Sequence, residues 1–115
     1  MTLILNCLIF HDNPYDDLFT VEIDDHKNIY ALKDTIRSQM KPRLDYIPAT
    51  ELDVWQAEIA PEDATTFVPR GQPLRAGRGL NDIFKHNDEY KGDHAHVIVE
   101  PRGISLLMIF FWNIH

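Results

Sequence analysis

The segment 18–42, LFTVEIDDHKNIYALKDTIRSQMKP, constrains the fold of this chain more than any other part of it. Residues 19–23 alternate apolar and polar side chains, which is typical of a strand with one buried face. After a short polar break, Asn28 is a favourable N-cap, and the following residues predict an amphipathic helix that stops before Pro42. Because the sequence predicts no other long helix, the rest of the chain has to supply strands and loops that pack around this one.

The predicted helix carries a narrow apolar stripe at spacings of three and four residues, formed by Ile29, Leu32, Ile36 and Met40. Its charged residues are expected to point elsewhere, and these are Lys33, Asp34 and Arg37. A lone helix in a small domain most simply turns such a stripe toward the core, and a partner-binding helix has the same pattern. We predict a core-facing helix and keep partner binding as the alternative.

Further strands are predicted on both sides of this segment. Residues 3–10 are apolar on both faces, as in a central strand, and the turn chemistry of residues 11–17 makes an antiparallel hairpin with the next strand. Residues 51–59 and 95–100 are two more strand candidates. The predicted order is two strands, one helix, a third strand, an irregular stretch and a final strand. This order indicates an α+β domain.

The irregular stretch begins with residues 60–79, which are rich in proline, glycine and polar residues and predict a long surface loop. A short strand near residues 73–75 is the one regular element expected there. Residues 79–84 predict a short turn whose apolar anchors are Leu80, Ile83 and Phe84. The local basic cluster in this stretch is either a solvated surface or a site for phosphate or an acidic partner, and it consists of Arg70, Arg75 and Arg78.

Length and charge exclude several classes of protein. The chain has 115 residues, enough for one domain, and its 44% hydrophobic and 25% charged residues are ordinary for a globular protein. A formal net charge of −7 disfavours nucleic-acid binding. The single cysteine, Cys7, allows no internal disulfide and no multi-cysteine zinc site, and its apolar strand suits a small core residue.

No residue pattern predicts a catalytic, cofactor-binding or metal-binding centre. Asp16, Asp17, Asp24 and Asp25 lack the spacing of a calcium loop and are expected to be solvated turn residues. His94 and His96 stand two apart and share a face of the last strand, so we keep a two-histidine metal edge, with Asp93 or Glu100 nearby, as a minor hypothesis. Cys7 in an apolar strand is a poor nucleophile.

Residues 51–59 contain the candidate interaction residue. If Leu52 and Val54 face the helix, then Trp55 lies on the opposite, open face of the sheet. A partly exposed tryptophan there predicts a protein-partner contact. The alternative is that the loop after this strand covers Trp55.

Five segments together resemble the N-terminal header domain of Crinkler effectors from oomycetes and fungi, and the element order is similar to the β-grasp fold of ubiquitin. The segments are LNCLIF at 5–10, FTVEI at 19–23, LKDTIR at 32–37, ELDVWQAEI at 51–59 and LNDIF at 80–84. The resemblance implies a four- or five-stranded mixed sheet packed on one helix. The family has its Leu-x-Leu-Phe-Leu-Ala-Lys translocation motif where this chain has residues 52–58.

In that motif, Leu52 and Ala57 match outright, Val54 and Trp55 are similar in kind, and Gln56 and Glu58 depart. The resemblance implies a non-enzymatic domain for secretion and translocation into a host cell, with effector activity in a separate C-terminal domain and no cofactor. It implies a secreted, host-directed location, with the host nucleus as one destination, although residues 1–10 lack the basic start and cleavage site of a signal peptide. The alternative is an intracellular, cytoplasmic ubiquitin-like adaptor that binds a host or cellular protein through its open sheet face.

The last twelve residues, ISLLMIFFWNIH, differ from the rest of the chain. They are too short for a membrane span, which needs about 20 apolar residues. We therefore expect a domain over residues 1–103 and an apolar tail over residues 104–115. The tail is an added packed element, an interfacial anchor or a non-native extension. No diglycine ends the chain, so ubiquitin-like conjugation is not expected.

Overall fold

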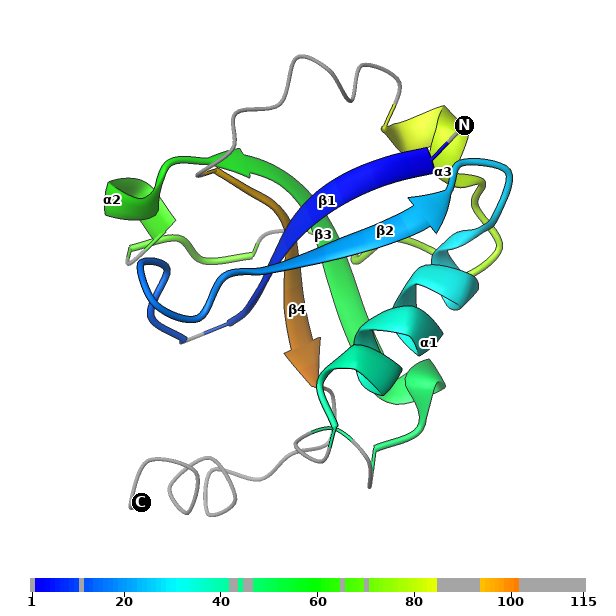
Figure 1. Cartoon of the computed structure of the whole chain (residues 1–115), viewed down its shortest axis with the longest axis horizontal. Coiled ribbons are helices and arrows are strands. Elements are labelled where there is room, and N and C mark those ends of the chain that lie inside the picture. The colour runs from blue at the N-terminus through cyan, green and yellow to red at the C-terminus, as the bar shows by residue number, and fades with distance from the viewer. Residues whose placement is uncertain are drawn as a thin grey trace.

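The computed structural model describes residues 2–10, 12–41, 44, 47–64, 66–69, 71–84 and 94–101. Its strands are β1 (Thr2–Ile9), β2 (Phe19–Asp24), β3 (Leu52–Ile59) and β4 (Ala95–Pro101), and its main helix is α1 (Ile29–Gln39) (Figure 1). Short helical segments lie in the connections, and these are η1 (Ala49–Glu51), α2 (Pro61–Ala64) and α3 (Leu80–Ile83).

Within the described residues the sheet has four strands in the order β2-β1-β4-β3. β1 and β2 form the predicted antiparallel hairpin, β1 and β4 are parallel, and β3 and β4 are antiparallel. The sheet is therefore mixed, as predicted. Residues 73–75 do not form the short strand expected there; instead the Leu74 N–H donates a single hydrogen bond to the Val54 carbonyl at 2.8 Å.

The main core lies between α1 and one face of the sheet. Ile29, Leu32 and Ile36 are fully buried, and Met40 packs at the edge of the same cluster, so the prediction of a core-facing stripe is confirmed. The strand residues that meet the helix alternate along each strand, as the sequence pattern requires. Each fully buried aliphatic side chain in such a core contributes about 1.5–3 kcal/mol to the free energy of unfolding.

The charged helix residues were expected to point elsewhere than the apolar stripe, and Lys33 is not part of the main core cluster, but it is buried nonetheless, with only 4% of its surface exposed. Arg37, one turn later on the same flank, donates from Nε to the Ile47 carbonyl at 2.6 Å. Ile47, in the connection from α1 to β3, therefore lies against this flank of the helix. Helical periodicity identifies the core side of a helix but not a connection that returns over another side.

Both ends of α1 have defined hydrogen bonds. Asn28 is the N-cap, as predicted, and its Oδ1 accepts from the Ala31 N–H at 3.0 Å. The backbone N–H groups of Ile29 and Tyr30 have no acceptor within the helix. They donate instead to the carbonyls of Arg78 and Ala76, both at 2.9 Å. The helix ends at Gln39, before Pro42, which lies outside the described residues.

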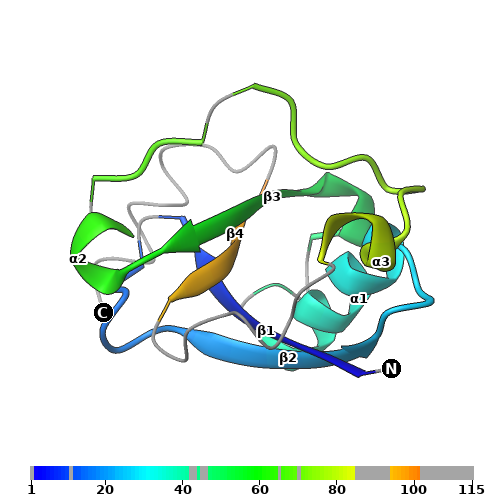
Figure 2. The same cartoon turned by 90° about the horizontal axis from the view of Figure 1, so that it is seen from above.

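The opposite face of the sheet is partly covered by the segment after β3, as one of the two alternatives for Trp55 expected. Leu8, Ala95 and Ile98 form a second buried cluster there, and Ala64 and Phe67 pack against it. The predicted loop of residues 60–79 therefore begins with a helical turn, α2, and returns over the sheet. Both views place α2 at one end of the molecule and α1 with α3 at the other (Figures 1 and 2).

The expected boundary at residue 103 and the apolar tail of residues 104–115 lie outside the described residues, and both stay predictions. In the part of the chain that is described, no helix has the length and apolar character needed to cross a membrane.

Candidate protein-interaction face

Strand β3 divides the four motif-like residues between two environments. Leu52 and Val54 are fully buried in the main core, as expected of side chains that face α1. Trp55 and Ala57 are half-buried on the opposite face, where Ala57 packs against the second cluster. Of the four residues, only Trp55 and Ala57 could contact another molecule while the sheet stays folded.

Trp55 is neither open to solvent nor fully covered. It stands opposite Ile98 in the pairing of β3 with β4, and its Nε1 is inaccessible to solvent without a hydrogen-bond partner among the described residues. A buried indole N–H usually has an acceptor. Trp55 is thus partly covered and partly exposed, and a partner contact through it stays a prediction.

His94 and His96 lie on the same face and both approach Glu58. The Nδ1 of His94 lies 2.9 Å from one carboxylate oxygen of Glu58, and the Nε2 of His96 lies 3.9 Å from the other. The pairing register of β3 shifts between Gln56 and Ile59, and Glu58 lies within this irregular stretch. Sequence reasoning named the two histidines but missed Glu58 as their partner, because it is distant from them in sequence.

Asn6 joins this group to β1 and β2. Its backbone N–H donates to His96 Nδ1 at 2.9 Å, and its Nδ2 donates to the His94 carbonyl at 3.0 Å. The Thr20 hydroxyl donates to Asn6 Oδ1 at 2.9 Å. A line of polar contacts therefore crosses all four strands, from Thr20 on β2 to Glu58 on β3.

These contacts indicate which ring nitrogen of each histidine acts as a donor and which as an acceptor. Because His96 Nδ1 accepts from Asn6, the neutral ring carries its proton on Nε2, the atom that faces Glu58. His94 Nδ1 donates to the carboxylate of Glu58, which can only accept. Both rings are used to join strands, so a metal at the two-histidine edge would have to compete with Asn6 and Glu58. Asp93, the first carboxylate proposed for that edge, lies outside the described residues.

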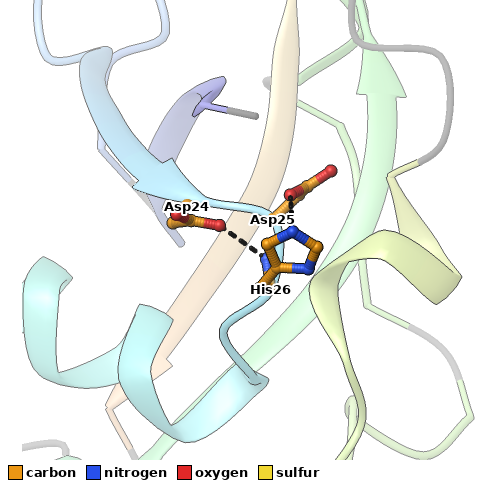
Figure 3. A group of neighbouring side chains, drawn as sticks. All are labelled: Asp24, Asp25 and His26. Atoms are coloured by element: carbon orange, nitrogen blue, oxygen red, sulfur yellow. Dashed lines mark hydrogen bonds and ion pairs between the residues drawn. The ribbon is translucent and has the colours of Figure 1, made fainter.

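A second group of potential metal ligands lies in the turn after β2, where Asp24, Asp25 and His26 bring one ligand atom each within 4.8 Å of the others (Figure 3). The Asp24 Oδ1 accepts from the His26 N–H at 2.8 Å, and this hydrogen bond holds the pKa of the Asp24 carboxyl below its usual range. The His26 side chain is 78% exposed, and the three residues are consecutive. The described contacts explain this group as a hydrogen-bonded turn.

Cys7 lies fully buried in β1, and burial raises the pKa of its thiol far above the usual range. Its Sγ donates a weak hydrogen bond to the Leu5 carbonyl at 3.7 Å. A neutral, inaccessible thiol fits a core residue and does not fit a nucleophile. Among the basic residues, Arg75 and Arg78 are exposed, and Arg70 lies outside the described residues.

Solved structures with this fold define its class. The C-terminal ubiquitin-like domain of mouse tubulin-specific chaperone e matches with a TM-score of 0.52 at 16% sequence identity, covering 91% of each chain. The Arabidopsis thaliana protein At2g32350 matches with a TM-score of 0.53 at 17% identity, covering 91% of this chain and 92% of that one. At such identities the likeness shows the fold alone, and it makes this chain a ubiquitin-like domain, as predicted.

The family is shown by the sequence match to the Crinkler effector protein N-terminal domain, which covers residues 3–100. The chain belongs to this family, as its five segments predicted, and the family is not known to be catalytic. No curated protein sequence matches the chain significantly.

Proposed function

We propose that this domain is a non-enzymatic N-terminal module that carries a Crinkler-type effector out of the producing cell and into a host cell. The observation that carries the proposal is the family match over residues 3–100. Secretion and host targeting are what the family implies for its members. The effector activity itself would belong to a separate C-terminal domain.

The position of the motif-like segment supports a particular way of working. Leu52 and Val54 are fully buried, so they hold β3 in the core and are not available to a receptor. Trp55 and Ala57 lie on the other face with part of their surface exposed. We infer that any recognition of this segment acts through Trp55, Ala57 and their surroundings.

The absence of enzymatic activity is supported by the state of the candidate groups. The Cys7 thiol is buried with a raised pKa, and His94 and His96 are held between Asn6 and Glu58. A nucleophile needs an accessible thiolate, and a general base needs a free ring nitrogen within reach of substrate. Neither histidine offers an unengaged Nδ1 among the described contacts.

The test is the location of a tagged protein. A fluorescent reporter is fused behind residue 115 and produced in the source organism during contact with its host. We expect the reporter inside host cells, above the level given by the reporter alone. Retention of the fusion inside the producing cell throughout host contact would overturn the proposal.

A second candidate function is an intracellular adaptor that binds a protein partner through the face around Trp55. The partly exposed tryptophan on the face away from α1 favours it. The adaptor predicts retention in the producing cell together with a partner whose capture is lost in Trp55→Ala. Unchanged capture by a correctly folded Trp55→Ala variant would count against it.

A further inference from the structure

A surface groove of about 720 Å³ lies between the β1–β2 turn and the segment that follows α2. Its lining residues include neither the two histidines with Glu58 nor the turn of residues 24–26. Both views show α2 beside the turn that joins β1 to β2 (Figures 1 and 2). One wall comes from Asp12 to Tyr15, and the other from Thr66 to Val68. Phe10 and Phe67 line the groove and also pack against the second cluster, which joins the two walls.

The groove exposes apolar surface that the fold does not use. Tyr15 is 64% exposed and Val68 is 61% exposed, and these are the two most exposed large apolar side chains among the described residues. They stand on opposite walls of the same groove. Scattered exposed apolar residues are ordinary, but a facing pair above two phenylalanines is typical of a surface that meets another molecule.

The wall that carries Tyr15 is held in place before any partner binds. Asn13 Oδ1 accepts from the Tyr15 N–H at 2.8 Å, and the Asn13 N–H donates to the Asp17 carboxylate at 3.1 Å. Asn13 Nδ2 donates to the Asp16 carboxylate at 3.0 Å. A wall fixed in this way loses little conformational entropy on binding, which favours affinity.

The charged residues that the structure describes at the groove and beside it are acidic. Asp12 lines it, Asp16 and Asp17 follow in the same turn, and Glu62 and Asp63 stand on α2, next to the other wall. None of the described lining residues is lysine or arginine. Acidic rims of this kind attract positively charged partners and repel acidic ones.

We propose that the groove between the β1–β2 turn and residues 66–68 binds an extended peptide segment that carries apolar side chains next to lysine or arginine. The phenylalanine floor with Tyr15 and Val68 would take the apolar side chains, and the acidic rim would pair with the basic ones. An open groove cannot enclose a small ligand as small-molecule sites do, so a chain that also contacts the rim is the better fit.

The test uses the full chain and a library of random twelve-residue peptides displayed on phage. Enriched peptides are synthesised with a fluorescent label, and their affinities are measured by anisotropy for the wild type and for Tyr15→Ala, Val68→Ser and Asp12→Asn. Tyr30→Ala is the matched control, because Tyr30 is an exposed tyrosine on α1, outside the groove.

The expected peptides are basic and apolar. Tyr15→Ala and Val68→Ser should each weaken binding about ten-fold, and Tyr30→Ala should leave it unchanged. Asp12→Asn should weaken binding at about 50 mM salt and have little effect at about 500 mM, where charges are screened. Circular dichroism of each variant separates lost binding from lost folding, and Val68 is exposed enough for Val68→Ser to fold if Tyr15→Ala does not.

Four outcomes overturn the proposal. The first is no enrichment, and the second is enrichment of acidic or uncharged peptides. The third is equal binding by the wild type and both apolar-wall variants. The fourth is that another occupant already fills the groove. Self-association lost in Tyr15→Ala would identify a second copy, and NMR cross-peaks from Tyr15 to residues 104–115 would identify the chain's own tail.

Discussion

At the scale of single residues, Asn6 connects β1 with Thr20 of β2 and with His94 and His96 at the start of β4. It is a polar residue between two apolar neighbours in β1, and it is only 6% exposed to solvent. Its side chain links Thr20 and the His94 carbonyl, and its backbone fixes the His96 ring. The parallel ladder between β1 and β4 covers only residues 7–9 of β1, so Asn6 extends this contact beyond the ladder.

Replacing Asn6 by alanine should lower the free energy of unfolding by about 1–3 kcal/mol, because it removes two partly buried hydrogen bonds, to the Thr20 hydroxyl and the His94 carbonyl. Thr20→Val, which removes one bond from an exposed residue, should cost about 1 kcal/mol or less. Urea denaturation followed by tryptophan fluorescence measures both. A cost for Asn6→Ala no larger than that for Thr20→Val would contradict the role of the network.

Cys7 gives a second prediction at this scale. Because burial keeps the thiol neutral and inaccessible, native protein should not react with a thiol-specific reagent such as dithionitrobenzoate over an hour at pH 8. The same protein in about 6 M guanidinium should react completely within minutes. Rapid labelling of the native protein would show that β1 opens easily or that Cys7 is exposed.

Asp24 gives a prediction of pH dependence. Its native pKa is lowered by the hydrogen bond from the His26 N–H, so the ionised carboxylate favours the folded state. This contribution is present above the ordinary aspartate pKa of about 3.9 and is lost as pH falls through the lower native pKa. Asp24→Asn keeps an acceptor without the charge, so its melting temperature should lie below the wild type at pH 6 and converge on it near pH 2. A difference that grows as pH falls would contradict this.

At the scale of elements, α1 is defined by its N-cap and its stripe, both of which could be predicted because helical spacing and capping are local properties. What could not be predicted is where distant segments return. Lys33 is buried although it is charged, and Ala64 of α2 with Phe67 packs on the second face of the sheet. Glu58 meets His94 only through the register of two strands, which local patterns do not specify.

The N-cap prediction belongs to this scale. Asn28→Ala should lower the free energy of unfolding by about 1 kcal/mol, because the Ala31 N–H loses its acceptor. Asn28→Ser should retain most of the stability, since serine is also a favourable N-cap. Chemical denaturation of the three proteins measures the difference. Equal losses in the alanine and serine variants would show that Arg78 and Ala76, not the cap, hold the start of α1.

At the scale of the whole molecule, the main helix α1 packs on one face of the sheet that β1, β2, β3 and β4 form within the described residues, and the two faces of this sheet differ. The face toward α1 holds the main core, and its residues explain the fold. The other face holds a smaller cluster, the polar line from Thr20 to Glu58, and the half-buried Trp55. The helix that organises the chain turns its apolar stripe into the core, and the surfaces for which we propose a function are the second sheet face and the groove beside α2.

The most direct test of this account is the delivery of a reporter by variants of Trp55, on the face of β3 that points away from α1, and of a control residue on α1. Delivery into host cells is measured per molecule of folded fusion for the wild type, Trp55→Phe, Trp55→Ala and the surface control Tyr30→Ala. We expect Tyr30→Ala to deliver like the wild type, Trp55→Phe to deliver less, and Trp55→Ala to fall about ten-fold or more. Wild-type delivery by a folded Trp55→Ala variant would contradict the claim that the second face of the sheet carries the function.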